Sequence, residues 1–353
     1  MARIAINGFG RIGRGFMRAV YSERGQGAHL PAPMLRQAGG GKEIEIVAVN
    51  DLAPAGNLAY LLKYDTVYGR APFSVAEEEG SLVVGGARVR LTQERDPAKL
   101  PWRDERIDIV VESTGMFTTA EKARAHIAAG AKKVVITSPA KGEGVDTILI
   151  GANEEKFGSC GDITSNASCT TNACSPLVGI LGEALGIERA ILNTTHAYTA
   201  SQQIVDGTAP DDFRRGRAGA ANLGPSSTGA AKATALVHPD LKGKFDGIAV
   251  RVPVPSGSIV DITFVSKRPT SAEEVNEVLR KAAGSDRWKR VFAVTEEPLV
   301  SSDILGQPYG AIADLPMTRV VDGTLVKVLA WYDNEMGYAH TLVHHVMEVA
   351  KRL

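Results

Sequence analysis

Cys169 and His196 are the two residues whose types and surroundings most clearly indicate chemistry. Cys169 lies within the run Ser-Asn-Ala-Ser-Cys-Thr-Thr-Asn (165–172), which precedes an apolar stretch with helical spacing. Because Ser, Asn and Thr are strong N-cap residues, the cysteine is predicted at or beside a helix N-terminus. There the helix dipole and free backbone amides favour a thiolate. The pattern therefore predicts an activated cysteine nucleophile.

The lengths of the next two elements predict that His196 lies beside this cysteine. About fifteen helical residues after Thr170 advance the chain by about 23 Å. About seven extended residues from Arg189 bring it back by about 23 Å. A thiolate and an imidazolium at this place suit nucleophilic catalysis, and the imidazole can also move protons. The alternative is a pair of buried residues without chemistry.

The other cysteines and one histidine pair give weaker signals. Cys174, five positions after Cys169, is predicted to be a buried core thiol, and Cys160 lies in a turn beside glycine. The spacings of the three cysteines fit neither a zinc half-site nor a disulfide framework. His340 and His344 are four residues apart without an evident third ligand, so a helix face is expected and no metal site is predicted.

A glycine-rich turn near the N-terminus indicates dinucleotide binding. Gly8, Gly10 and Gly13 form G-x-G-x-x-G between a predicted strand at 3–7 and a predicted helix at 10–21. The first glycine permits a tight turn, the second lets a pyrophosphate approach the backbone, and the third lets the helix pack against the strand. A glycine turn without a ligand is the alternative interpretation.

Asp51 closes the next predicted strand, residues 44–50, where a carboxylate can accept hydrogen bonds from ribose hydroxyls. Its distance from Gly13 exceeds the roughly twenty residues expected of this motif. An insertion at about 24–41, rich in Gly and Pro, accounts for the excess. A plain turn residue is the competing interpretation of Asp51.

Two further segments could bind anions. Arg251 is a charge inside an otherwise apolar strand, and a buried guanidinium needs either a carboxylate partner or a ligand phosphate. Both possibilities are open. The hydroxyl-rich start of a helix at 225–232 suits a phosphate, whereas the arginines at 214–217 fit a solvated loop face better than a site.

These residues must be positioned by two kinds of architecture. The first part of the chain alternates strands and helices, which predicts a Rossmann-type doubly wound parallel sheet. Later segments are longer strands joined by Pro, Gly and Ser turns, which predicts an α+β catalytic domain with a mostly antiparallel sheet. The predicted strands are 3–7, 44–50, 107–111, 133–137, 147–151, 189–195, 248–254, 258–266 and 324–332, and the predicted helices include 10–21, 119–129 and 339–353.

Length and composition exclude several classes of protein. The 353 residues are enough for about two domains, and 44% of them are hydrophobic, so the chain should fold around sizeable cores. The 40 basic and 40 acidic residues balance, which gives no support to a nucleic-acid or membrane-surface protein. With no membrane-spanning or signal-peptide pattern, a cytoplasmic location is expected.

Six motifs together resemble the phosphorylating glyceraldehyde-3-phosphate dehydrogenase family. They are Asn-Gly-Phe-Gly-Arg-Ile-Gly-Arg (7–14), the cysteine-centred octapeptide (165–172), His-Ala-Tyr-Thr (196–199), Ser-Thr-Gly-Ala-Ala-Lys (227–232), Val-Arg-Val-Pro (250–253) and Trp-Tyr-Asp-Asn-Glu (331–335). The resemblance covers nearly the whole chain apart from the insertion. It implies conversion of glyceraldehyde 3-phosphate to an acyl phosphate, with Cys169 forming a thiohemiacetal and then a thioester and His196 acting as its base.

The resemblance also implies ligands and their residues. NAD is the expected cofactor, with NADP secondary, and a homotetramer is expected. Thr199 and Arg251 match positions that hold the substrate's phosphate. Residues assigned to the attacking phosphate and the rest of the substrate site are Ser168, Thr170, Arg215, Thr228 and Gly229, and further cofactor contacts are Arg11, Ile12, Thr114, Thr137, Asn334 and Tyr338. The implied domains are 1–168 with 334–353 for NAD and 169–333 for catalysis.

The choice between NAD and NADP and the choice between related functions have alternatives. Gly207-Thr208 stands where strictly NAD-dependent members carry Leu-Pro, and the loss of that pair weakens the selectivity against NADP. Asp51 retains this selectivity, because its carboxylate repels a 2′-phosphate. Erythrose-4-phosphate dehydrogenase and a non-catalytic NAD-binding partner protein are the rival functions. The intact Cys169, His196 and phosphate-site residues favour the phosphorylating enzyme.

Overall fold

The computed structural model describes residues 1–22, 44–210 and 212–353, which form two compact units. The first unit comprises Met1–Ile148, Glu154–Ala167 and Leu342–Leu353, and the second comprises Leu149–Asn153 and Ser168–Thr341. The predicted insertion at 24–41 lies outside the described residues.

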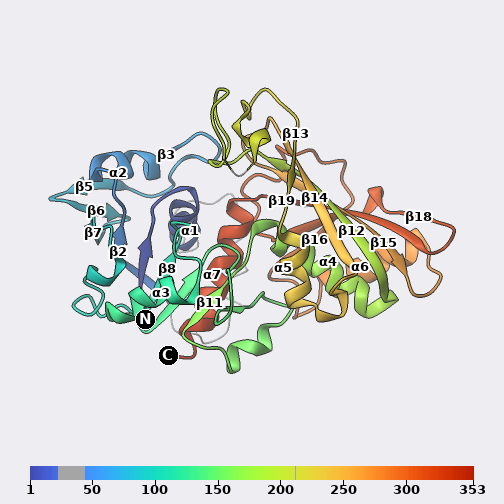
Figure 1. Ribbon diagram of the computed structural model, residues 1–353, viewed down its shortest axis with the longest axis horizontal. Helices are drawn as coiled ribbons and strands as arrows, with labels where there is room; N and C mark the ends of the chain where they lie inside the picture. The colour runs from blue at the N-terminus through green and yellow to red at the C-terminus, as the bar shows by residue number, and fades with distance from the viewer. Residues whose placement is uncertain (23–43, 211) are drawn as a thin grey trace. The chain divides into compact units, whose positions relative to one another are not determined.

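A nine-stranded sheet forms the centre of the first unit (Figure 1). β1 pairs in parallel with β2 on one side and with β8 on the other, so the predicted Rossmann-type arrangement is confirmed. In sheet order the strands are β10 (Asp146–Thr147), β11 (Ile163–Ser165), β9 (Lys133–Ile136), β8 (Ile109–Glu112), β1 (Ala2–Asn7), β2 (Ile44–Asn50), β7 (Ala87–Thr92), β6 (Ser81–Val84) and β5 (Val75–Glu78).

Short, buried strands and capped helices explain this unit. All four residues of β8 are buried, as expected of a parallel strand covered on both faces. The side chain of Thr119 caps α3 (Ala120–Ala128) by accepting a hydrogen bond from the Lys122 amide at 3.3 Å. The other elements of this unit are α1 (Arg11–Ser22), α2 (Ala55–Lys63) and the hairpin β3 (Tyr64–Asp65) and β4 (Gly69–Arg70).

Two features of the first sheet differ from the sequence prediction. The strand predicted at 147–151 is wrong beyond its first residue, because β10 ends at Thr147 and Leu149–Asn153 belongs to the second unit. The strands β5, β6 and β7 at one edge of the sheet and the short strand β11 were not predicted. β5 pairs with β6, and β6 with β7, in antiparallel fashion. The sequence hides β5 because three of its four residues are exposed, two of them glutamates.

The second unit contains an eight-stranded sheet in which most pairs are antiparallel, as predicted. The pairs β12 with β14 and β16 with β17 are parallel. The strands in order are β13 (Gly224–Ser227), β14 (Phe245–Val252), β12 (Ile187–Ala197), β15 (Ser258–Ser266), β19 (Leu325–Tyr332), β17 (Ala311–Asp314) and β16 (Phe292–Thr295), with β18 (Arg319–Val321) also paired to β19.

Helices cover one face of this second sheet. The helices α4 (Cys169–Leu185), α5 (Ala230–Val237) and α6 (Ala272–Ala283) pack together against it (Figure 1). Every second residue of β15 is buried, which is the alternation expected of a strand with one covered face. The buried residues of β12 and β19 include His196 and Tyr332, so these two side chains lie on the covered side.

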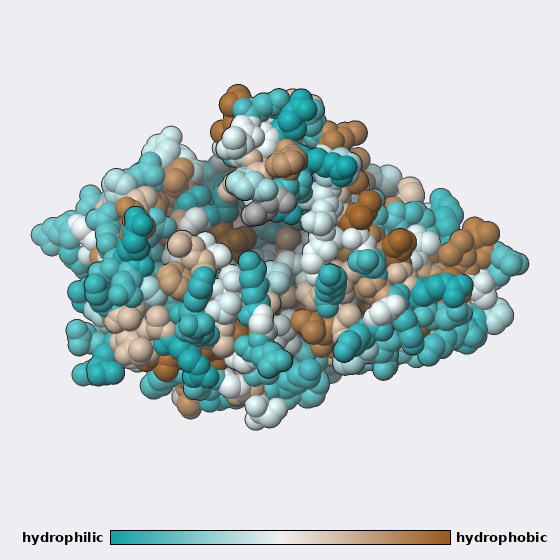
Figure 2. All heavy atoms as spheres, viewed as in Figure 1, coloured by the Kyte–Doolittle hydropathy of each residue, from teal (hydrophilic) through white to brown (hydrophobic). Residues whose placement is uncertain are grey.

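The last helix, α7 (Met336–Ala350), includes the predicted apolar stripe, and its residues from Leu342 onward belong to the first unit. Figure 2 shows a visible face dominated by hydrophilic side chains, with hydrophobic atoms in separate patches. No helix among the described residues has the length and apolar character needed to cross a membrane.

Candidate active site and dinucleotide cradle

Cys169 is the first residue of α4, as the sequence predicts. The N-cap is Ser168, whose side chain accepts a hydrogen bond from the backbone amide of Thr171 at 3.1 Å. The preceding Ala167 has φ of 53°, a left-handed conformation that is uncommon for a residue with a Cβ atom. The cysteine is therefore held at the N-terminal end of the helix, where the dipole favours negative charge.

His196 lies where the lengths of α4 and β12 predict it. Its Nε2 atom is 3.4 Å from Sγ of Cys169. The imidazole is almost fully buried, with 4% of its surface exposed. Its other nitrogen, Nδ1, lies 2.7 Å from the carbonyl oxygen of Ala197. The structure thus brings a thiol and an imidazole into direct contact, as nucleophilic catalysis requires.

Burial opposes the charges that were predicted for this pair. It raises the pKa of the Cys169 thiol, although the charge of Arg251 and the Thr170 hydrogen bonds act in the opposite direction. Burial and the charge of Arg251 lower the pKa of His196 to about 3. These shifts favour a thiol beside a neutral imidazole over the predicted thiolate and imidazolium. A neutral imidazole can accept a proton, so the pair retains the arrangement needed for general-base chemistry.

Tyr332 contacts His196 and the residue after Cys169, and this role was not predicted, although Tyr332 lies in the motif at 331–335. Its hydroxyl lies 3.0 Å from Oγ1 of Thr170 and 2.8 Å from Oγ1 of Thr194. Its ring meets the His196 ring edge-on, with centroids 5.8 Å apart. Burial raises the pKa of Tyr332, so the hydroxyl keeps its proton. In sequence Tyr332 is one more buried position of an alternating strand, which is why its role was missed.

Arg251 lies opposite His196 in the pairing of β14 with β12. Its Nη1 atom is 2.8 Å from Nδ1 of His196 and donates to the Ala197 carbonyl at 3.1 Å. Its Nε atom is buried and has no hydrogen-bond partner. Within the described chain no carboxylate pairs with this guanidinium, so its positive charge is left for an anionic ligand.

Arg215 provides a second positive charge near the Arg251 guanidinium. Arg215 donates to Ser226 of β13, which pairs with β14, the strand that carries Arg251. Burial is the main cause that lowers the pKa of Arg251, and the charge of Arg215 acts in the same direction. Arg215 is itself held by Oγ of Ser226 at 3.1 Å and by Asp212 at 3.4 Å. Arg214 and Arg217 are exposed, as predicted for a loop face.

The remaining predicted phosphate ligands lie at turns and at a helix end. Thr199 follows β12, and its hydroxyl lies 2.9 Å from that of Ser201. Thr228 and Gly229 immediately precede α5, and Gly229 is its N-cap. The described contacts do not join Thr228 or Gly229 to Cys169 and His196, although α5 packs beside α4.

In the first unit, the three glycines satisfy the requirements of a dinucleotide cradle. Gly8 has φ of 91°, and a Cβ atom there would lie 2.7 Å from the amide nitrogen of Thr114. A Cβ atom on Gly13 would lie 2.3 Å from the carbonyl oxygen of Gly8. Gly10, by contrast, faces open space, with no atom within 4 Å of its Cβ position. This combination of two close backbone approaches and one open position fits a bound pyrophosphate at the start of α1.

Asp51 follows β2 directly and faces the same turn. Its Oδ2 atom accepts a hydrogen bond from the Phe9 amide at 2.7 Å, and Oδ1 accepts one from the Ala53 amide at 3.0 Å. Thr114 is exposed beside Gly8, and the hydroxyl of Thr137 donates to the Glu112 carbonyl at 3.1 Å. The structure thus places Asp51 and Thr114 at the carboxyl ends of β2 and β8, the two strands that flank β1, and such sheets bind ligands at this end of the strands.

The other four predicted cofactor residues lie in both units. Arg11 and Ile12 begin α1, and Arg11 forms an ion pair with Asp65. Asn334 belongs to the second unit, where its Oδ1 atom accepts hydrogen bonds from Oγ of Ser258 and from the amide of Gly257. Its amide group is thereby oriented. Tyr338 is buried in α7.

The residues set aside as unreactive are buried or lie apart from the site. Cys174 is fully buried, as predicted, and the three cysteines are free thiols. His340 and His344 are buried on α7, so the expected helix face is a packed one. In residues 1–22, 44–210 and 212–353, no group of three or more potential ligands could hold a metal ion.

Comparison with known proteins gives consistent matches along the chain. The family model described as "Glyceraldehyde 3-phosphate dehydrogenase, NAD binding domain" matches residues 2–120, and the model of the C-terminal domain matches residues 168–334. The chain is similar to glyceraldehyde-3-phosphate dehydrogenases from Mycobacterium avium (47% identical), Streptomyces coelicolor (46%) and Mycobacterium tuberculosis (45%). Each alignment covers 99% of both chains.

Proposed function

The chain belongs to the glyceraldehyde-3-phosphate dehydrogenase family, and from this premise we propose that Cys169 and His196 are its nucleophile and base. The reaction is the reversible conversion of D-glyceraldehyde 3-phosphate and inorganic phosphate to 1,3-bisphosphoglycerate, with NAD as oxidant. The observation that carries the assignment is the contact of 3.4 Å between Cys169 Sγ and His196 Nε2 at the start of α4. Erythrose-4-phosphate dehydrogenase and a non-catalytic protein are the outcomes to be tested against it.

The first half of the reaction needs only this pair. As Sγ of Cys169 attacks the aldehyde carbon, Nε2 of His196 takes the thiol proton and passes it to the carbonyl oxygen, and a thiohemiacetal forms. The α4 N-terminus stabilises negative charge that develops near the sulfur. Tyr332 supports the step by fixing the His196 ring and the Thr170 hydroxyl.

The second half needs an oxidant and a second anion. Bound NAD supplies a hydride acceptor, and we assign its binding to Gly8, Gly10, Arg11, Ile12, Gly13, Asp51, Thr114, Thr137, Asn334 and Tyr338. The thiohemiacetal carbon would lose its hydride to that acceptor while Nε2 of His196 takes the hydroxyl proton, which leaves a thioester on Cys169. Inorganic phosphate then attacks the thioester carbon, the sulfur leaves, and the acyl phosphate is released.

Two groups of residues are assigned to the phosphates. Arg251 and Thr199 hold the phosphate of the substrate, and the lack of a carboxylate partner for Arg251 among the described residues supports this assignment. Thr170, Arg215, Thr228 and Gly229 surround the attacking phosphate, and Ser168 is assigned to the same substrate and phosphate site. Arg215 is held by Ser226 beside β14, the strand of Arg251, and this second positive charge supports two anions in one site.

Varying the concentration of inorganic phosphate tests the function directly. With glyceraldehyde 3-phosphate and NAD present, we expect NADH formation to depend on phosphate and to saturate with it. Turnover that does not depend on phosphate would indicate hydrolysis of the thioester, as in erythrose-4-phosphate dehydrogenase. An absence of turnover with retained NAD binding would indicate the non-catalytic alternative.

Asp51 is proposed to select NAD over NADP, because its carboxylate repels a 2′-phosphate. Asp51→Ala removes that charge, and the small Gly207-Thr208 pair leaves no other barrier at the position where NAD-specific members carry one. We expect kcat/KM for NADP to rise about tenfold, which corresponds to about 1.4 kcal/mol. The value for NAD should fall, because a ribose partner is lost. Steady-state kinetics with both cofactors measures the change.

Asp51→Asn is the matched variant for this test. It keeps an oxygen that can accept from the Phe9 amide, so the turn is retained while the charge is removed. It should gain NADP activity as Asp51→Ala does. If neither variant gains activity with NADP, the residue that discriminates the cofactors lies elsewhere.

We further propose a homotetramer with domain boundaries at 168/169 and 333/334. The face of the second sheet that α4, α5 and α6 leave uncovered carries exposed apolar residues, including Ile191 (62%) and Ile248 (54%). In Figure 2 several hydrophobic patches lie over the strands of this unit, on the right of the view. Apolar patches of this kind favour burial against another chain, here further copies of the same chain.

A cytoplasmic location and a role in glycolysis complete the proposal. The proposed nucleophile must remain a free thiol, and all three cysteines are free. Reducing compartments such as the cytoplasm keep thiols in this state.

A further inference from the structure

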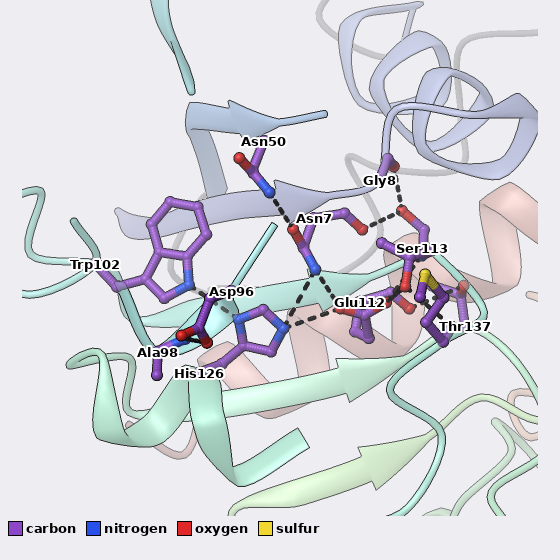
Figure 3. Close-up of polar contacts among 12 residues, drawn as sticks. Asn7, Gly8, Asn50, Asp96, Ala98, Trp102, Glu112, Ser113, His126 and Thr137 are labelled. Atoms are coloured by element: carbon purple, nitrogen blue, oxygen red, sulfur yellow. Dashed lines mark hydrogen bonds and ion pairs between the residues drawn. The ribbon is translucent and has the colours of Figure 1, made fainter. Parts of the chain in front are cut away.

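Glu112 is a buried carboxylate that the reaction does not use. It closes β8, and only 1% of its surface is exposed. Oε1 accepts hydrogen bonds from the amide of Thr114 at 2.8 Å and from its hydroxyl at 2.5 Å. Oε2 accepts from Nδ2 of Asn7 at 2.6 Å and lies 2.9 Å from Nε2 of His126 (Figure 3). An ionised carboxylate is tolerated in a protein interior only with such a full set of partners.

The direction of each hydrogen bond around Glu112 is determined by its neighbours. The indole nitrogen of Trp102 lies 3.0 Å from Nδ1 of His126 and can only donate, so Nδ1 must accept (Figure 3). The proton of a neutral His126 ring is therefore on Nε2, from which it is donated to Glu112. On the other side, Asn50 Nδ2 donates to Asn7 Oδ1 at 2.7 Å, which turns the Asn7 amide nitrogen toward Glu112.

This network lies directly beneath the dinucleotide cradle. The Thr114 amide, held by Glu112, is the atom closest to the Cβ position of Gly8, at 2.7 Å. Ser113 ties the same segment to the turn, because its hydroxyl donates to the Gly8 carbonyl at 2.6 Å. Asn7 adjoins Gly8 in the chain. A displacement of Glu112 would therefore shift both walls of the cradle, the Gly8 turn and the exposed Thr114.

We propose that Glu112 is a positioning residue for NAD, and that His126, oriented by Trp102, holds Glu112 in place. Glu112 does not touch the cofactor; it acts through the Thr114 amide and through Asn7. The proposal rests on the proposed function only in that the first unit binds NAD at the Gly8–Gly13 turn.

Glu112→Gln tests the proposal with little change in size. A glutamine side chain has one oxygen that accepts and one NH₂ group that donates, so it cannot accept on both sides as Glu112 does. If its NH₂ group points toward His126 and Asn7, it faces two other donors. If the NH₂ group points toward Thr114, it faces the donating backbone amide. We expect the Kd for NAD, measured by calorimetry on folded protein, to rise about tenfold. The kcat at saturating NAD should stay within about threefold of the parent, because the Cys169 pair is unchanged.

Glu105→Gln is the matched control. Glu105 lies in the same unit but precedes β8, whereas Thr114 follows it, so the two residues lie at opposite ends of this strand. Glu105 forms ion pairs with Arg3 and Arg90. It is partly exposed, and such ion pairs contribute little to stability. The control should bind NAD as tightly as the parent protein.

A second pair of variants, at His126, distinguishes the hydrogen bond to Glu112 from simple packing. This pair tests the proposal even if Glu112→Gln does not fold. His126→Gln keeps an amide donor for Glu112, and His126→Leu removes it at similar size. We expect NAD affinity within about threefold of the parent for His126→Gln, and about tenfold weaker binding for His126→Leu. Equal weakening by the two variants would overturn the role of the hydrogen bond and indicate packing damage.

NAD binding by the parent protein distinguishes failure of the proposed function from failure of the positioning role of Glu112. If it does not bind NAD, the proposed function fails. If the parent binds NAD and folded Glu112→Gln binds it equally well, the function stands and the positioning role of Glu112 is wrong.

Discussion

Cys169→Ser should abolish dehydrogenase activity, with kcat falling by a factor of about 10⁴ or more. A serine hydroxyl is a far weaker nucleophile than a thiol, and the neighbouring imidazole has to remove a much less acidic proton. No thiohemiacetal or thioester can form without the sulfur, so neither hydride loss nor attack by phosphate can follow. NADH formation under saturating substrate, phosphate and NAD measures the loss, and calorimetry should show that NAD still binds.

Cys160→Ser provides the control for this experiment. It makes the same substitution at a half-exposed position in the first unit, where the thiol donates to the Phe157 carbonyl. Its activity should equal that of the parent protein. Turnover of Cys169→Ser within a few-fold of the parent would refute the assignment of the nucleophile.

His196→Asn should slow formation of the thioester by about 10²- to 10⁴-fold, the usual contribution of a general base. Burial keeps the pKa of His196 at about 3, so the ring is uncharged at neutral pH and able to accept the thiol proton. Asparagine can contact the sulfur but cannot take up that proton. Alkylation of Cys169 by iodoacetamide near neutral pH should slow as well, and stopped-flow measurement of the first turnover resolves the chemical step.

His238→Asn is the matched control, since His238 lies in the same unit and packs against Gly179 and away from the cysteine. It should leave both rates close to those of the parent. An unchanged alkylation rate in His196→Asn would show that the imidazole does not act on the thiol.

The sequence was most informative where function demands a particular backbone. Gly8 and Gly13 could be recognised because the close approaches at 2.7 Å and 2.3 Å exclude any side chain, so residue type reports the geometry directly. The meeting of Cys169 with His196 followed from the lengths of one helix and one strand. Both are local properties of the chain, which is why they can be read without a structure.

Features that depend on long-range packing were not predictable in this way. Tyr332 reaches the site because β19 and β12 both pair with β15 and turn the same face toward α4. Glu112 and His126 look like ordinary polar residues at a strand end and on a helix, and only the fold shows that both are buried. The ionisation of the Cys169 pair was predicted from the helix end alone, and desolvation by the surrounding core acts against it.

The place of Cys174 within α4 decides how the reactive sulfur responds to oxidants. Five helical residues rise by about 7.5 Å, which already exceeds the roughly 7 Å between Cα atoms that a disulfide can span. A sulfenic acid formed on Cys169 therefore has no resolving thiol in its own helix while α4 stays folded. Recovery depends on an external thiol such as glutathione, and without one continued peroxide exposure drives the residue to the irreversible sulfinic form.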